Sequence, residues 1–133
     1  MVEHAAVNGT RIAYTIDGPA NAPVLTMSHS LSADHSMWDP QMSALTDAYR
    51  VVRFDTRGHG ASDVPAGEYT LDQLASDVIS LWDHLGIEST HYCGLSMGGM
   101  IGQTLALKAP ERLRTLVLCD TASSYPPEAQ AMW

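Results

Sequence analysis

The sequence lacks the features that mark membrane and secreted proteins. No apolar run approaches the roughly 20 residues that a helix needs to cross a bilayer. The first residues do not join a basic segment to an apolar stretch, as a signal peptide does. We therefore expect a soluble, cytoplasmic protein with no membrane partner.

Basic residues are also few. Seven Lys and Arg residues stand against fifteen Asp and Glu residues, which gives a formal charge of −8 at pH 7. A chain with this balance repels phosphate backbones and anionic lipid headgroups. Nucleic acid is therefore not an expected partner.

Only two cysteines occur, Cys93 and Cys119, and they do not form a Cys-x-x-Cys pair. Both lie in apolar, strand-like runs, so we expect free, buried thiols rather than a disulfide or metal ligands. No two of the six histidines have the i, i+4 spacing of a helical metal site. We expect neither a metal nor a cofactor.

The sequence has enough apolar residues to form a core, and they fall into separate runs along the chain. Of its 133 residues, 45% are apolar, which is enough to fill the core of one domain. Apolar runs of strand length alternate with longer helical patterns. Strands are expected within 2–18, 22–30, 50–54, 89–96 and 113–120, and helices within 37–49, 69–86 and 97–110. This alternation predicts an α/β fold with a mostly parallel sheet covered by helices on both faces.

Short signals mark several of the expected element ends. Asn8-Gly9 predicts a tight hairpin turn, because both central residues of that turn need positive φ. Asp39 can cap a helix that has Pro40 in its first turn. Thr70 and Gln73 have the spacing of a capping box.

The most informative motif is Gly94-Leu95-Ser96-Met97-Gly98, which matches G-x-S-x-G between an expected strand and an expected helix. A serine on such a sharp turn has strained backbone, and side chains at Gly94 or Gly98 would collide with the neighbouring strand and helix. This context favours a nucleophile elbow. The alternative is that the glycines serve only a tight crossing of strand and helix.

Backbone N–H groups beside this serine can form an oxyanion hole. The helix that begins after Ser96 directs unpaired N–H groups and its positive dipole end toward a developing oxyanion. We assign the two donors to Leu31, in the loop after the strand within 22–30, and to Met97. The arrangement favours acyl transfer.

Other residues near these loops have two interpretations. His29 can be a general base or can order its loop through backbone hydrogen bonds, and the second is favoured. Trp38 and His29 are candidates for the substrate pocket, although Trp38 fits a core position equally well. Asp55, Arg57 and His59 can be drawn as a catalytic cluster, but charge-assisted bonds that tie a glycine-rich loop together are the favoured role.

Three stretches together resemble a known family. Residues 37–39 (Met-Trp-Asp), residues 55–62 (Asp-Thr-Arg-Gly-His-Gly-Ala-Ser) and residues 94–99 (Gly-Leu-Ser-Met-Gly-Gly) resemble the α/β-hydrolase superfamily, and within it 3-oxoadipate enol-lactonases and related esterases. The resemblance covers nearly the whole chain. It implies that Ser96 is the nucleophile, that Leu31 and Met97 are the oxyanion donors, and that the substrate is a small ester or lactone.

The same resemblance leaves alternatives open. The Ser-Met-Gly-Gly run at 96–99 is shared with cofactor-free haloperoxidase-like perhydrolases, so a perhydrolase reaction at the same elbow is the second hypothesis. A non-catalytic, self-associating fold fragment is the third. Similar dehalogenases and epoxide hydrolases use an aspartate nucleophile, which the elbow does not contain.

The resemblance also bears on the chain beyond the elbow. In the superfamily an acid and then a histidine come after the serine on later loops, and this sequence ends at Trp133 before either. We expect residues 1–121 to form the N-terminal part of the core, about six strands without the last strands or the cap, and 122–133 to resemble the start of the cap. Activity of this chain alone is expected to be weak or absent.

An incomplete sheet would have an exposed edge. The expected outer strand, Leu113 to Asp120, would carry unpaired backbone groups beside apolar side chains. We expect a homodimer through this edge. The alternative partner is a complementing C-terminal half that supplies the acid and the histidine.

Overall fold

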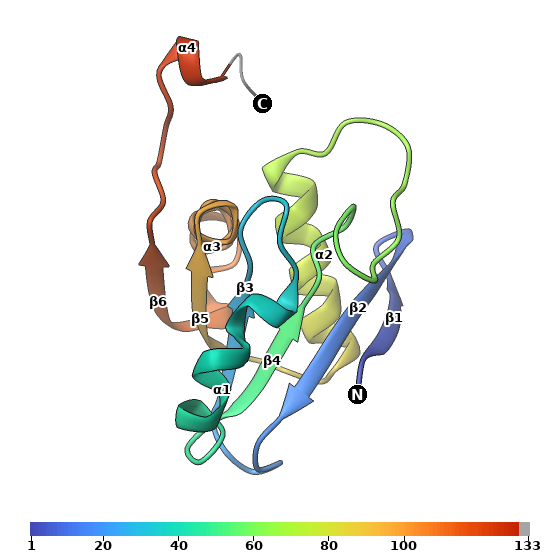
Figure 1. Cartoon of the computed structure of the whole chain (residues 1–133), viewed down its shortest axis with the longest axis vertical. Coiled ribbons are helices and arrows are strands. Elements are labelled where there is room, and N and C mark those ends of the chain that lie inside the picture. Colours follow the sequence, from blue (N-terminus) through green and yellow to red (C-terminus); the bar gives the residue numbers. More distant parts are fainter. Residues whose placement is uncertain (131–133) are drawn as a thin grey trace.

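A six-stranded sheet forms the centre of the structure, and helices cover both of its faces (Figure 1). The computed structural model describes residues 1–130. In chain order the elements are β1 (Glu3–Val7), β2 (Thr10–Asp17), β3 (Val24–Ser28), the 3₁₀ helix η1 (His35–Trp38), α1 (Asp39–Leu45), β4 (Arg50–Phe54), α2 (Leu71–His84), β5 (Thr90–Leu95), α3 (Met97–Lys108), the 3₁₀ helix η2 (Pro110–Arg112), β6 (Leu113–Cys119) and α4 (Pro127–Gln130).

The strands lie in the order β1-β2-β4-β3-β5-β6. β4, β3, β5 and β6 are parallel to one another, whereas β1 and β2 form an antiparallel hairpin whose second strand pairs antiparallel with β4. The predicted α/β class with a mostly parallel sheet and helices on both faces is confirmed. Because the parallel strands all end at one edge of the sheet, the loops after β3, β4 and β5 meet there.

The larger part of the core lies under α2 and α3. Trp82 of α2 is fully buried, and its Nε1 donates a hydrogen bond to Thr26 Oγ1 of β3 at 3.0 Å. The indole also meets the Tyr92 ring of β5 edge-on, with the ring centroids 6.5 Å apart. One tryptophan therefore links α2 to two central strands through both its apolar ring and its polar atom.

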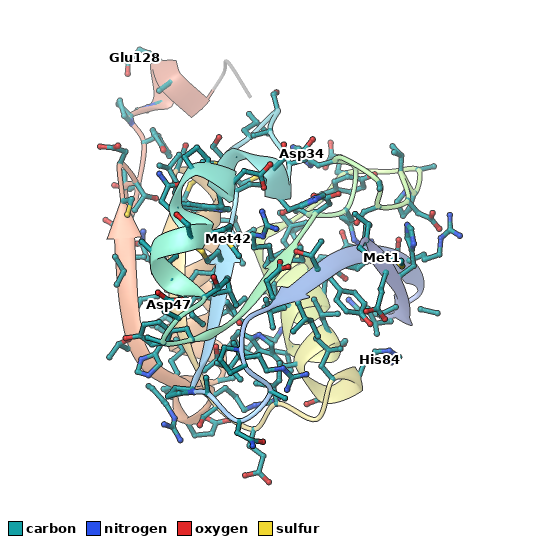
Figure 2. All side chains as sticks on the ribbon, turned by 60° about the horizontal axis from the view of Figure 1, so that its bottom comes forward. Met1, Asp34, Met42, Asp47, His84 and Glu128 are labelled. Atoms are coloured by element: carbon teal, nitrogen blue, oxygen red, sulfur yellow. The ribbon has the colours of Figure 1, made fainter. Side chains whose placement is uncertain are left out.

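The opposite face has a smaller core under α1. Leu25, Met27, Trp38 and Val51 are buried together there, and Met42 of α1 packs against them. Figure 2 shows Met42 between α1 and the sheet. The two clusters alternate along each central strand, as expected for a sheet that is covered on both sides.

β6, at one edge of the sheet, is covered less than the central strands. Each of its residues is at least partly exposed, and Val117 and Leu118 keep 49% and 42% of their surface accessible. Within the described residues, β5 is its only neighbouring strand. Figure 1 shows the chain continuing from β6 to α4 at a distance from the sheet. The predicted tail of 122–133 includes α4, and residues 131–133 of that tail lie outside the described residues.

Several expected element ends are confirmed and one is wrong. Asn8 and Gly9 form the β1–β2 turn with φ of +48° and +72°. Thr70 Oγ1 caps α2 by accepting a hydrogen bond from the Gln73 N–H at 3.1 Å. Asp39 does not cap α1: the helical segment already begins at η1, where Asp34 accepts from the Ser36 N–H.

The side chain of Asp39 forms a long-range ion pair instead of a helix cap. Its carboxylate lies 2.5 Å from Nη1 of Arg53 in β4, and the same guanidinium also pairs with Asp17 at 3.1 Å. The Asp39 carboxylate therefore pairs with a guanidinium on the sheet, and Trp38 takes the N-cap position of α1.

The two cysteines are free, as expected, but each is half-buried rather than buried. They lie on β5 and β6, with the Cys119 thiol beside that of Cys93. Burial, together with the neighbouring thiol, raises the pKa of Cys93 to about 12. At neutral pH Cys93 is therefore a protonated, unreactive thiol.

Within residues 1–130, no helix has the combination of length and apolar character needed to cross a bilayer.

The glycine-rich loop after β4 is held by buried charges. Asp55 is fully buried and accepts hydrogen bonds from the backbone and ring of His35 and from the Ala61 N–H. Arg57 forms a bidentate pair with Asp77 of α2, at 2.6 and 2.7 Å. The favoured structural role of Asp55 and Arg57 is therefore confirmed.

We predict that Asp77→Ala lowers the free energy of unfolding by about 3–5 kcal/mol, because it leaves the buried Arg57 without its partner. Asp72→Ala on the same helix is the matched control. Its exposed pair with Lys108 is worth about 1 kcal/mol at most. Urea unfolding of both variants measures the difference, and equal losses would contradict the role assigned to the Arg57 pair.

Candidate active site at the elbow of β5 and α3

Ser96 lies at the sharp turn between β5 and α3, with φ of 52° and ψ of −112°. This is a backbone region that side-chain-bearing residues rarely adopt. The surrounding backbone holds it there. The Ser96 N–H donates to the Cys119 carbonyl at 2.9 Å, and the Ser96 carbonyl accepts from the Gly99 N–H at 2.9 Å and from Thr121 Oγ1 at 2.8 Å.

The glycines on either side of Ser96 permit this close packing. A Cβ atom on Gly94 would lie 2.2 Å from the Gly98 carbonyl oxygen, and one on Gly98 would lie 2.3 Å from the Ser28 carbonyl oxygen of β3. Both contacts are with backbone atoms that cannot rotate away. The turn therefore excludes a side chain at either position.

Tyr92 supports the same turn from within the core. Its hydroxyl donates to the Gly98 carbonyl at 2.8 Å, and the residue is fully buried. Burial raises the pKa of Tyr92, so the phenol keeps its proton and remains a donor. Its ring also lies 2.7 Å from the position of a Cβ on Gly102. α3 therefore packs directly on β5.

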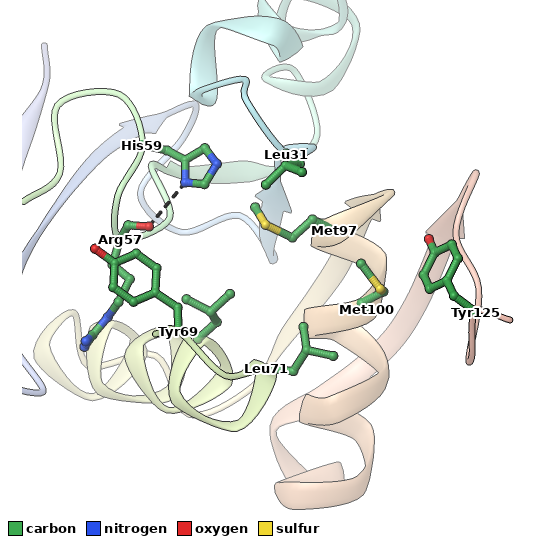
Figure 3. A pocket seen from close by; sticks show the side chains of 9 residues that line it. Leu31, Arg57, His59, Tyr69, Leu71, Met97, Met100 and Tyr125 are labelled. Atoms are coloured by element: carbon green, nitrogen blue, oxygen red, sulfur yellow. Dashed lines mark hydrogen bonds between the residues drawn. The ribbon is translucent and has the colours of Figure 1, made fainter. Parts of the chain in front are cut away.

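A cavity of about 280 Å³ opens beside the turn (Figure 3). Its wall combines the loops after β3 and β4 with the first turns of α2 and α3 and the segment before α4. The lining residues are Leu31, Arg57, His59, Tyr69, Leu71, Leu74, Met97, Met100 and Tyr125. Ser96 is half-buried and directly precedes the lining residue Met97.

Leu31 and Met97, the two expected oxyanion donors, line this same cavity. Met97 is the first residue of α3, so its N–H has no partner within the helix. Among the backbone bonds of the described loops, the N–H of Leu31 has no partner either. Figure 3 shows Leu31 and Met97 next to each other in the lining of the cavity.

His29 and Trp38, the two expected pocket residues, lie elsewhere. His29 is fully buried, and Trp38 packs with Leu25 and Met27 on the α1 face of the sheet. Neither side chain belongs to the lining of the cavity beside Ser96. The cavity beside Ser96 is therefore lined by other side chains, and Trp38 lines a separate cavity with Leu25 and Met27.

The hydrogen bonds of His29 define its protonation. Nδ1 lies 2.7 Å from the Ser30 carbonyl, which can only accept, and Nε2 accepts from the Thr56 N–H at 2.9 Å. The ring is therefore neutral with its proton on Nδ1, and burial lowers its pKa. This is the loop-ordering role, and it leaves no nitrogen free to act as a base.

Sequence reasoning missed the position of His59. It lies in the glycine-rich loop with Asp55 and Arg57, but its ring lines the cavity. The signal was available in the topology, because the loops after β3, β4 and β5 all emerge at one edge of the sheet. A histidine after β4 therefore lies near a serine after β5.

One set of side chains has the composition of a metal site. Single ligand atoms of Asp34, His35 and Asp55 lie within 4.8 Å of one another. Their polar atoms already bind the loop: Asp55 accepts from His35, and Asp34 accepts from the N–H and the hydroxyl of Ser36. These bonds account for the cluster.

Comparison with known proteins agrees with the geometry. The family model described as the alpha/beta hydrolase fold matches residues 23–133. The chain is 48% identical over 118 residues to 3-oxoadipate enol-lactonase 2 of Acinetobacter baylyi, a match that covers 89% of this chain and 44% of that enzyme. It thus spans less than half the length of that relative.

Solved structures show the same likeness. The enol-lactonase from Burkholderia xenovorans LB400 is 47% identical with a TM-score of 0.93, over 98% of this chain and 51% of that one. A thermophilic esterase from Thermogutta terrifontis is 33% identical with a TM-score of 0.89, over 99% of this chain and 50% of that one.

The neutral state of His29 predicts a pH dependence of stability. Because the pKa of His29 is lowered in the folded protein, its contribution is fully present above about pH 6.5, the ordinary histidine value, and is lost as the pH falls below it. The loss reaches at most about 1.4 kcal/mol per pH unit.

His29→Asn removes this contribution. Urea unfolding at about pH 7.5 and about pH 5.5 should show a smaller loss of stability on acidification for the variant than for the original protein. His84→Asn, on the exposed last turn of α2, should keep the original slope. An unchanged slope in His29→Asn would contradict the buried neutral assignment.

Proposed function

The chain belongs to the α/β-hydrolase family, and from that membership we propose that it forms the nucleophile half of a serine hydrolase that cleaves small carboxylic esters or lactones. The observation that carries this proposal is the backbone of Ser96, held at φ 52° by four hydrogen bonds and two glycines. Strain of this kind persists where function requires a side chain in an exposed position.

In the proposed reaction, Ser96 Oγ attacks the ester carbonyl carbon while its proton passes to a base. The carbonyl oxygen becomes an oxyanion that accepts hydrogen bonds from the N–H groups of Leu31 and Met97. The intermediate then expels the alcohol, which takes up a proton, and leaves an acyl group on Ser96. Water hydrolyses this acyl-enzyme to the acid and restores the serine.

The substrate class is inferred from the cavity and the relatives. The cavity is small and mostly apolar, which suits a short acyl chain or a lactone ring. Enol-lactone hydrolysis is named for the relatives from Acinetobacter and Burkholderia, and ester hydrolysis for the one from Thermogutta. We propose the same bond class for this protein, with an enol-lactone as the first candidate.

Turnover by these 133 residues is expected to be slow. Among the described residues, no side chain forms a hydrogen bond with the Ser96 hydroxyl, and a serine without a base is a weak nucleophile. An oxyanion hole and substrate binding alone leave roughly 10³–10⁴-fold acceleration over water.

We predict that a fluorophosphonate probe labels Ser96 and that p-nitrophenyl acetate is hydrolysed above the buffer rate. Ser96→Ala should lose both signals. Ser89→Ala, at the opposite end of β5, should keep them. Mass spectrometry of the labelled protein identifies the residue, and equal hydrolysis by the original protein and Ser96→Ala would refute the proposal.

The exposed β6 supports the expected pairing with a second copy of the chain. Unpaired N–H and C=O groups at a strand edge bind another strand readily, and exposed Val117 and Leu118 add apolar surface on both sides. In this arrangement two β6 strands pair and join the sheets.

Val117→Lys should shift the dimer toward monomer, because a charge beside a strand edge opposes pairing. Val64→Lys is the control, since Val64 is 75% exposed in a loop. Sedimentation over a dilution series at micromolar concentration measures both variants. A protein that is monomeric throughout would exclude the pairing proposal.

A further inference from the structure

The polar side chains of Arg57 and Tyr69 in the cavity wall are already bound within the protein. The Arg57 guanidinium pairs with Asp77, and the Tyr69 hydroxyl donates to the Pro65 carbonyl at 2.5 Å. Much of the remaining wall is apolar, formed by Leu31, Leu71, Leu74, Met97 and Met100. Besides the N–H groups of Leu31 and Met97, which are assigned to the oxyanion, the His59 ring is therefore a polar group in this wall that a ligand can meet.

The tautomer of His59 follows from its one hydrogen bond. Nδ1 lies 3.2 Å from the Arg57 carbonyl oxygen, which can only accept, so Nδ1 carries the proton. In the neutral ring Nε2 then has a lone pair and no proton. No described side chain or backbone group bonds Nε2, and Figure 3 shows that nitrogen on the side of the ring that faces Leu31 and Met97.

The loop fixes this acceptor in place. The His59 N–H donates to the Thr56 carbonyl at 2.9 Å, and its carbonyl accepts from the Ser62 N–H at 3.1 Å. Gly60 has φ of +52°, and a Cβ there would lie 2.2 Å from Asp55 Oδ2. A ring anchored in this way loses little freedom when a ligand binds.

We propose that His59 selects the substrate: the cavity takes an ester or lactone whose short apolar acyl part carries a hydroxyl or amide N–H, and that group donates a hydrogen bond to His59 Nε2. The ester or lactone part of this inference rests on the proposed function. The role given to His59 is binding, separate from the attack by Ser96.

Two esters that differ in one hydroxyl test the inference. We compare p-nitrophenyl 3-hydroxybutyrate with p-nitrophenyl butyrate and divide each kcat/KM by the rate of hydrolysis in buffer, which removes their difference in intrinsic reactivity. One neutral hydrogen bond corresponds to about a five- to tenfold preference for the hydroxy ester.

Three variants show where that preference arises. His59→Phe keeps a ring but removes the acceptor, so the preference should disappear. His59→Gln offers a carbonyl oxygen near the position of Nε2, so part of the preference should return. His84→Gln on the surface of α2 should leave it unchanged. If His59→Phe slows both esters equally, His59 acts in the reaction rather than in selection, and the inference is overturned.

Binding to Ser96→Ala separates this inference from the proposed function. Calorimetric titration with ethyl 3-hydroxybutyrate and ethyl butyrate should give the same five- to tenfold difference, roughly one hydrogen bond, without any turnover. If the unsubstituted protein hydrolyses neither ester while Ser96→Ala still binds the hydroxy ester more tightly, the hydrolase proposal fails and the selectivity stands. Equal binding of the two esters would overturn the selectivity.

Discussion

The backbone conformation of Ser96 is the constraint on which the neighbouring structure depends. A serine reaches this conformation only where its surroundings hold it. The surroundings here include a carbonyl from β6, a hydroxyl from Thr121 and the first turn of α3. Gly94 and Gly98 then let the strand, the helix and β3 approach one another at backbone distance. The close packing thus holds Ser96 in its strained conformation.

The neighbouring loops are also held in place by bonds to buried groups. The loop after β4 is fixed by the buried Asp55 and by the Arg57–Asp77 pair, and the loop after β3 by His29. Their charges and imidazoles are used for positioning, which leaves the cavity wall mostly apolar. The result is a rigid frame in which few polar atoms face a ligand, an arrangement typical of small-molecule sites.

The sequence predicted those parts of the molecule that depend on local chemistry. The Asn8-Gly9 turn, the Thr70 cap and the alternation of strands and helices each follow from neighbouring residues. Asp39 was assigned wrongly because its partner, Arg53, comes from a strand that no local pattern connects to it. The cavity position of His59 depends on strand order in the same way. Pairings of this kind, between residues far apart in the sequence, can be predicted only when the order of the strands in the sheet is known.

The bond from the Ser96 N–H to the Cys119 carbonyl also sets an order of events. The serine precedes β6 in the chain, so it leaves the ribosome before the strand that completes its surroundings. Contacts between distant residues form only after the intervening chain has closed into a loop. The conformation of the turn therefore cannot be completed before β6 has been synthesised and has paired with β5.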